Sequence, residues 1–167
     1  VTGQYIAVRP GGGSKQNSFV GLDQPPLYDR SKPGRNLILT SKSLGSIKKG
    51  VKVLYRQIPV GEVTGYELAN TADHVRIYIN VLPYYVPLLR ESTKFWNASG
   101  VAVNISPFSG ASIRTNSFES LIEGGIAFAT PNNPDMGAHA SEDGIYQLHD
   151  KAEPAWLIWS PNIQLGK

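Results

Sequence analysis

Hydrophobic and polar residues alternate along most of the chain in short segments, and this period of two is typical of half-buried β-strands. Helical spacing is limited to two short segments, residues 83–91 and 117–122, and residues 43–49 fit a short helical turn or a loop. Strands are expected at residues 5–8, 36–41, 51–56, 62–68, 74–81, 101–106, 126–130 and 145–149. The pattern predicts an all-β fold, a compact antiparallel sandwich or barrel of about seven strands with short helical turns.

Composition supports a turn-rich chain and excludes several kinds of function. There are 17 Gly and 12 Pro among 167 residues, which favours many short elements, and residues 132–144 are expected to form a long exposed loop. The net charge of +3 is too small to indicate a nucleic-acid partner. The absence of Cys excludes disulfides and thiolate chemistry. We expect no membrane span and no signal peptide in these residues, because no apolar run is long enough.

A short internal repeat indicates that the chain contains parts of more than one module. Residues 3–10 (GQYIAVRP) match residues 124–131 (GGIAFATP), and residues 155–160 fall near the place where strand 36–41 would recur. Repeats at a fixed period are typical of tandem arrays. The expected boundaries are the end of a preceding module at 1–26, a linker at 27–33, a whole module at 34–150, and a linker or the start of the next module at 151–167.

Three motifs in the central module are characteristic of a known family. They are GVKVLYR at 50–56 with VGEV at 60–63, FWNASGV at 95–101, and SFESLIEGGIAF at 117–128. In order and spacing, residues 34–150 resemble the MCE (mammalian cell entry) domain, as found in the multi-module envelope proteins of that family.

The resemblance implies an MCE-type small β-barrel whose copies assemble into a homo-hexameric ring, with rings stacked into a tunnel across the periplasm. It implies a parent protein anchored in the inner membrane of a Gram-negative bacterium, which carries phospholipids or other lipids between the inner and outer membranes. The implied partners are lipids, further copies of the chain and an inner-membrane protein, with no cofactor and no nucleic acid. In the family, the loop that corresponds to residues 116–125 lines the central pore.

The residues of that loop fit such a role. Phe118, Leu121 and Ile122 are spaced i, i+3, i+4 and form one apolar face of a helical turn. Gly124 and Gly125 end the turn and act as a hinge into the next strand. The resemblance implies that the apolar face contacts lipid in the pore. The alternative from the spacing alone is that this face packs onto its own barrel.

Charge is segregated along the chain. Residues 30–56 contain eight Lys or Arg and no acid, whereas residues 115–150 contain six acids and no Lys or Arg. One hypothesis is that the two regions meet between neighbouring copies or stacked rings, where complementary charge would set the register. The residues proposed for these contacts are Lys48, Lys49, Glu119 and Glu123. The alternatives are two solvated faces, or attraction of lipid headgroups by the lysines.

Enzyme and metal-site motifs find little support in the sequence. His74, His139 and His149 lack metal-type spacing, and neither an HExxH motif nor a nucleophile elbow occurs. One group in a predicted loop could gather a cation: Asp135, His139, Glu142 and Asp143. We expect no enzyme and no metal site. The alternative function, from a different class, is a structural periplasmic scaffold module that oligomerises without conducting lipid.

Four aromatic residues near predicted turns are expected to pack the ends of the barrel core: Tyr84, Tyr85, Phe95 and Trp96. Arg56 follows a predicted strand and is expected to pair or cap structurally. Gly61 is expected to meet the backbone requirement of a tight turn.

Overall fold

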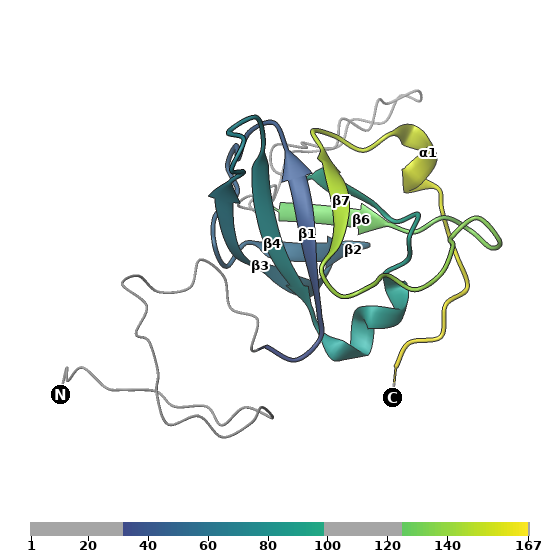
Figure 1. Cartoon of the computed structure of the whole chain (residues 1–167). Helices are drawn as coiled ribbons and strands as arrows, with labels where there is room; N and C mark the ends of the chain where they lie inside the picture. Colours follow the sequence, from purple (N-terminus) through teal and green to yellow (C-terminus); the bar gives the residue numbers. More distant parts are fainter. Residues whose placement is uncertain (1–31, 99–124, 167) are drawn as a thin grey trace, which may run out of the picture.

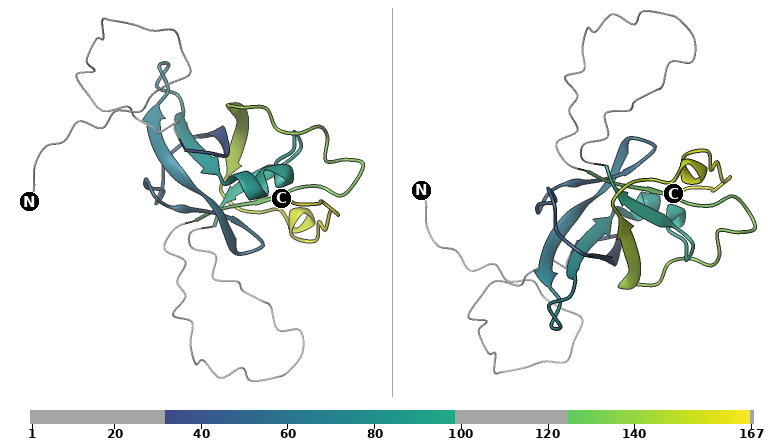
Figure 2. Two further views of the ribbon diagram at one scale, coloured as in Figure 1. Left: turned by 90° about the horizontal axis from the view of Figure 1, so that it is seen from below. Right: turned by 90° about the horizontal axis from the view of Figure 1, so that it is seen from above.

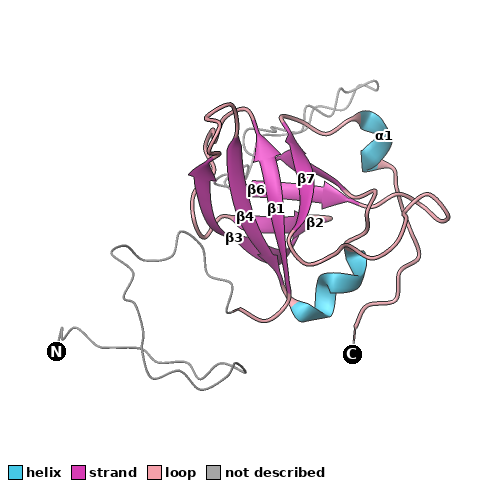
Figure 3. Ribbon diagram, viewed as in Figure 1, coloured by secondary structure: helices cyan, strands magenta, loops and turns pink. Residues whose placement is uncertain are grey.

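The computed structural model describes residues 32–98 and 125–166, and in them seven strands close into a barrel (Figure 1). The strands are β1 (Arg35–Ser41), β2 (Lys52–Tyr55), β3 (Ile58–Leu68), β4 (Val75–Val81), β5 (Lys94–Asn97), β6 (Gly125–Ala129) and β7 (Gly144–His149). A 3₁₀ helix, η1 (Pro83–Leu88), and one turn of α-helix, α1 (Pro154–Leu157), complete the elements (Figure 3). The predicted all-β barrel of about seven strands is confirmed.

The barrel is mixed, so the expectation of a purely antiparallel arrangement is wrong. Around the barrel the order is β1-β4-β3-β2-β6-β5-β7. The pairs β1–β4, β3–β4, β2–β3 and β5–β6 are antiparallel, whereas β1–β7, β2–β6 and β5–β7 are parallel. The parallel pairs join strands that are far apart in sequence, and they are the pairs that close the barrel. Local hydrophobic patterns do not report such pairings.

Six predicted strands correspond to β1, β2, β3, β4, β6 and β7, and β5 was missed. The predicted strands 5–8 and 101–106 and the predicted helix 117–122 lie outside the described residues. The segment 43–49 is a loop, and the predicted turn at 83–91 contains η1. Loop 132–144 is only partly exposed, because Met136 and Ala140 are buried. Within the described ranges, no helix is long and apolar enough to cross a membrane.

The core fills the inside of the barrel with alternate side chains from every strand. Its most deeply buried members include Leu37, Leu39, Ile77, Ile79 and Phe95. The packing continues through Leu88, the last residue of η1, and Leu89, whereas Tyr84, which was expected in the core, is half exposed. The expectation of core packing is confirmed for Phe95 and in part for Tyr85, which is partly buried against the core, and Trp96 is buried with its ring against Trp156.

Gly61 is required by a close approach of two strands, which corrects the expected tight turn. It lies within β3, where a Cβ atom would come 2.3 Å from the backbone oxygen of Asn80 on β4. The tight turn instead lies at Arg56 and Gln57, which both have positive φ (50° and 68°), as a type I′ hairpin turn requires. Next to it, the pairing of β2 with β3 contains a β-bulge.

The barrel has two ends that matter for function. At the first, which we call the loop end, β1 finishes at Ser41, β5 at Asn97 and β7 at His149, while β6 begins at Gly125. The other, which we call the opposite end, contains the start of β1 at Arg35, the β2–β3 turn and η1. In Figure 1 the loop end is uppermost and η1 lies at the bottom.

Residues 151–166, here called the C-terminal segment, pack along the outside of the barrel from the loop end to the opposite end. In Figure 1 this segment descends from α1 to the level of η1, and the views in Figure 2 place α1 beside the barrel. Residues 154–157 are helical, so the expectation that strand 36–41 recurs near 155–160 is wrong. The predicted module boundary at residue 150 stays a prediction.

Candidate functional site: the base of the loop between β5 and β6

Most of the predicted site residues lie outside the described part of the chain. These are Phe118, Glu119, Leu121, Ile122, Glu123 and Gly124. Gly125 is the first residue of β6 and is buried. What the structure describes is the base from which residues 99–124 leave the barrel and to which they return.

The two ends of that segment are held side by side in the β-ladder. Asn97 pairs with Ile126, and the Ala98 N–H donates to the carbonyl oxygen of Gly125 over 2.8 Å. On its other edge β6 pairs with β2, with Lys52 in register with Gly125. Residues 98 and 125, which flank this segment, therefore lie on adjacent strands, and both of these strands are bonded on both edges.

A cluster of aromatic rings inside the barrel makes this base rigid. The ring of Phe128 on β6 lies 5.2 Å from that of Phe95 on β5 and 5.1 Å from that of Tyr55 on β2. Phe95 also contacts Tyr146 of β7, ring to ring, at 5.3 Å. Tilted and edge-to-face pairs at these separations are favourable geometries for aromatic packing. Four strands, β2, β5, β6 and β7, are thus tied together by these side chains.

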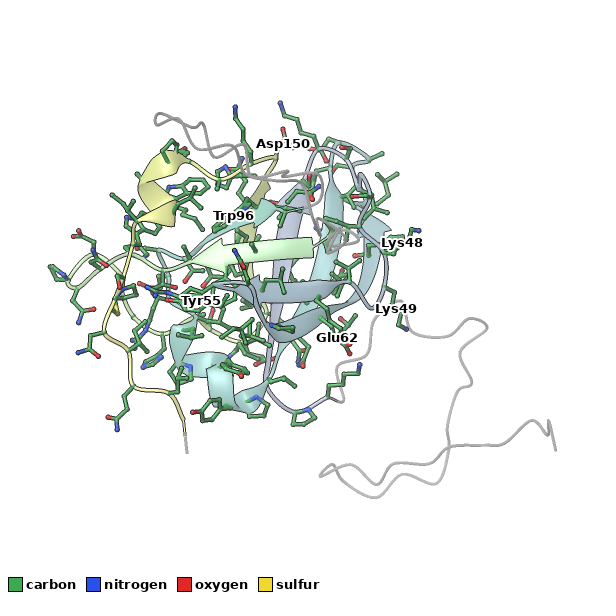
Figure 4. All side chains as sticks on the ribbon, turned by 180° about the vertical axis from the view of Figure 1, so that it is seen from behind. Lys48, Lys49, Tyr55, Glu62, Trp96 and Asp150 are labelled. Carbon is green, nitrogen blue, oxygen red and sulfur yellow. The ribbon has the colours of Figure 1, made fainter. Side chains whose placement is uncertain are left out.

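Lys48 and Lys49 lie on a loop at the same end of the barrel. Both are exposed, and Figure 4 shows them at the margin of the barrel, away from Trp96. Ile47 anchors their loop in the core with only 2% exposure. The Gly50 N–H donates to the Val63 carbonyl over 2.8 Å. These two charges are therefore held on an anchored loop that precedes β2, the strand paired with the start of β6.

Some of the segregated charges meet within one copy of the chain. Arg35, from the basic region, lies 3.4 Å from Glu142, from the acidic region, and Glu142 also accepts a 2.8 Å hydrogen bond from the Asn36 side chain. These two residues of the segregated regions therefore meet within one barrel, and the hypothesis of contacts between copies through Lys48, Lys49, Glu119 and Glu123 stays a prediction. This ion pair joins β1 to the loop between β6 and β7. The two residues are far apart in sequence, so the sequence alone did not indicate the contact.

Glu62 on β3 is shared by two lysines of the basic region. Lys32 forms an ion pair with it, and Lys52 lies 3.5 Å away. The hydrogen bond from Lys32 is the main reason that the pKa of the Glu62 carboxyl is lowered, and Lys52 acts in the same direction. The charge on Glu62 is therefore largely neutralised by its own barrel.

The candidate cation group is not assembled. Among the described residues, no three His, Asp or Glu side chains are grouped so that they could hold a metal ion. His139 lies in an isolated β-bridge with Arg90, and Glu142 is used by Arg35. His74 is paired with its neighbour Asp73, at 2.7 Å.

A family model described as MlaD protein matches residues 33–125, more than half of the chain, from the start of β1 to the start of β6. The chain belongs to this family, the MlaD family of MCE domains. The predicted resemblance is thus confirmed, and so is the prediction that the chain is not an enzyme.

Two similar proteins carry the MCE module within much longer chains. The lipophilic envelope-spanning tunnel protein B of Escherichia coli (strain K12) is 34% identical over 147 residues, which cover 88% of this chain and 17% of that protein. A probable intermembrane transport protein of Haemophilus influenzae is 32% identical over 155 residues, 93% of this chain and 17% of that protein. The chain thus spans about a sixth of each relative's length.

Sequence reasoning missed the residues that attach the C-terminal segment to this MCE barrel. Trp156 of α1 is buried between Trp96 on β5, at 6.1 Å, and His149 on β7, at 4.8 Å. Arg56 donates from Nη2 to the carbonyl of Trp159 over 3.3 Å and to Oγ of Ser160 over 2.9 Å. The expectation that Arg56 pairs structurally is confirmed. The clustering of two Trp within four residues was the available signal.

Proposed function

We propose that this chain is a lipid-conducting module of a transport protein in the bacterial cell envelope. The observation that carries the proposal is the similarity, over 88% of the chain, to a protein named for a lipophilic tunnel that spans the envelope. Because both relatives are several times longer, the module contributes one section of a conduit. Six copies form a ring, and stacked rings form a tunnel in the periplasm of a Gram-negative bacterium, anchored in the inner membrane.

The lipid-contacting residues in this proposal are Phe118, Leu121 and Ile122, on the loop that leaves the barrel between β5 and β6. The rigid base supports the idea, because it would present the loop from the same place in every copy of a ring. Burying one CH₂ group contributes about 0.8 kcal/mol, so a collar of apolar residues can retain part of an acyl chain and still release it. Gly124 and Gly125 would serve as the hinge, and β6 begins at Gly125.

Neighbouring copies are proposed to contact one another through Lys48 and Lys49 on one side and Glu119 and Glu123 on the other. The exposure of both lysines on an anchored loop supports this. Exposed ion pairs are screened by salt. Raising the salt concentration should therefore shift the oligomer toward smaller species in sedimentation velocity, and an unchanged distribution would remove this contact from the proposal.

The partners of the whole protein are phospholipids or other lipids, further copies of the same chain and an inner-membrane protein. No cofactor and no nucleic acid is needed for such a function, because lipid moves by partition between apolar surfaces. A module that only holds a periplasmic assembly together is the alternative, and contact with lipid at the loop separates the two.

The test is site-specific photocrosslinking in the full-length protein in cells. A photoreactive amino acid replaces Leu121 in one variant and Lys48 in a matched control, because Lys48 is exposed at the same end of the barrel. We expect phospholipid on the Leu121 adduct and little on the Lys48 adduct.

Assembly is checked for both variants by native mass. Absence of lipid from Leu121, in a protein that is folded and assembled, would leave the scaffold function as the better account. Equal yields at both positions would indicate nonspecific contact with membrane and would also count against a lipid-lined pore.

A further inference from the structure

β3 is much longer than its neighbour β2, and this difference leaves part of the β3 backbone without a partner. β3 spans 11 residues, whereas β2 spans four. The last contact between the two backbones joins Val63 to Gly50 and Val51, just before β2, by two hydrogen bonds of 2.8 Å. Beyond Val63, β3 continues to Leu68, and among the described residues it is paired there with β4 alone.

The unpaired part, here called the β3 edge, consists of Tyr66 and Leu68. The Ala69 N–H donates to the His74 carbonyl over 2.9 Å, and hydrogen-bonded and non-bonded pairs alternate along an antiparallel ladder. Tyr66 and Leu68 therefore fall at non-bonded pairs, and their N–H and C=O groups face away from β4. No backbone hydrogen bond between residues that the structure describes reaches them from the other side. The β3 edge thus offers two donors and two acceptors to a further strand.

The side chains of the β3 edge are apolar and accessible. Tyr66 is 41% exposed and Leu68 is 61% exposed, and neither is a charged residue or a proline, the residues that usually protect an edge. The carboxylate of Glu67, between them, is already paired, because it accepts a hydrogen bond from the Tyr78 hydroxyl and lies 3.8 Å from Arg76. An added strand would therefore find an apolar face beside the free backbone groups.

Positive charge borders the β3 edge. Lys48 and Lys49 directly precede Gly50, whose N–H is bonded to Val63, and both lysine side chains are exposed (Figure 4). Within residues 32–98 and 125–166, neither lysine forms an ion pair. Lysines beside an edge disfavour pairing with a second, identical edge, because like charges are brought together. The same lysines would attract a strand that carries carboxylates.

We propose that the β3 edge binds an extended segment of another polypeptide by strand addition, and that this segment alternates apolar and acidic residues. In strand addition, main-chain hydrogen bonds supply the affinity, and side chains at alternate positions supply the specificity. The apolar residues of the segment pack on Tyr66 and Leu68, and its carboxylates are attracted by Lys48 and Lys49. The proposal does not rest on the lipid-conducting function, and it concerns the β3 backbone, which the contact proposed between copies does not use.

The experiment follows amide hydrogen exchange of single residues by NMR in the 167-residue chain. The probe is a short peptide with capped ends that alternates Val and Glu, and the control peptide alternates Val and Lys. In the free chain, the amides of Tyr66 and Leu68 should exchange fast, whereas the amide of Glu67 is protected by its bond to β4. The Val–Glu peptide at saturation should slow exchange at Tyr66 and Leu68 by about tenfold, and the Val–Lys peptide should not.

Variants separate the contributions of backbone, side chain and charge. Leu68→Ala keeps the edge N–H and should weaken binding of the Val–Glu peptide by about threefold, whereas Leu68→Pro removes the donor and should abolish binding. Lys48→Gln combined with Lys49→Gln should weaken binding by about fivefold at low salt and by less at high salt. Circular dichroism shows whether each variant is folded, and the lysine variant tests the proposal if Leu68→Pro does not fold.

Three results would overturn the proposal. Slow exchange of Tyr66 and Leu68 in the free chain at every concentration would show that another part of the same chain covers the β3 edge. Protection that increases with the concentration of the chain would assign the β3 edge to a second copy. Equal protection by both peptides, or by neither, would exclude an acidic strand as its partner. None of these results depends on the lipid crosslink at Leu121.

Discussion

Replacing Trp156 by alanine tests whether the C-terminal segment is part of the folded module or only lies beside it. The side chain is 6% exposed and contacts the rings of Trp96, His149 and Trp159. A buried Trp removes about 150–250 Å² from water, which at about 25 cal/mol per Å² corresponds to an upper bound of about 4–6 kcal/mol. Because the site is on the outer wall and can partly collapse, we expect a loss of about 3 kcal/mol.

The assay is urea unfolding followed by far-UV circular dichroism, combined with hydrogen exchange of residues 151–166. Leu157→Ala is the matched control, because it lies on the same helical turn but is 66% exposed. Its free energy of unfolding should change by less than about 0.5 kcal/mol. In Trp156→Ala, the midpoint should fall and the exchange of the segment should accelerate.

The reasoning would be refuted if Trp156→Ala lowered the free energy of unfolding no more than Leu157→Ala does. It would also fail if exchange in the segment became fast while the unfolding of the barrel was unchanged. In that case the segment would dock without contributing to the cooperative unit.

Two further predictions concern the wall formed by β3. Gly61→Ala places a methyl group against the backbone oxygen of Asn80, and we expect it to lower the free energy of unfolding by about 3 kcal/mol; an unchanged melting temperature would contradict this. Glu62→Gln should destabilise by less than about 1 kcal/mol at about pH 7, because the side chains of Lys32 and Lys52 are 42% and 58% exposed. The folded-state pKa of Glu62 lies below its ordinary value of 4.5, so this difference should disappear on acidification below that value, and a pH-independent difference would refute the assignment.

The family and most of the strands could be predicted because they depend on local order in the sequence. Six strands follow from the alternation of inward and outward residues, which is a property of each segment by itself. β5 was missed because Lys94–Asn97 is only four residues long and ends in two large aromatic residues and an amide, without a clear alternation. Its place in the barrel depends on pairing with β6 and β7.

The same difference between local pattern and long-range pairing applies to the segment between β5 and β6. Its apolar face of Phe118, Leu121 and Ile122 could be identified from helical spacing and from the family motif. Its base could not, because the adjacency of Ala98 and Gly125 requires β5 and β6 to pair across a long separation. The sharing of Glu142 between Arg35 and Asn36 is hidden for the same reason.

By itself, the sequence determined six of the seven described strands, which family the chain belongs to, and that chemistry based on cysteine is absent. Only the tertiary structure decided the parallel closure of the barrel, the need for glycine at position 61 and the docking of Trp156 on Trp96. The physical reason is that the alternation of buried and exposed positions is a property of a few neighbouring residues. Strand partners, close backbone approaches and surface docking depend on contacts between distant segments, whose free energy appears only when the chain is assembled.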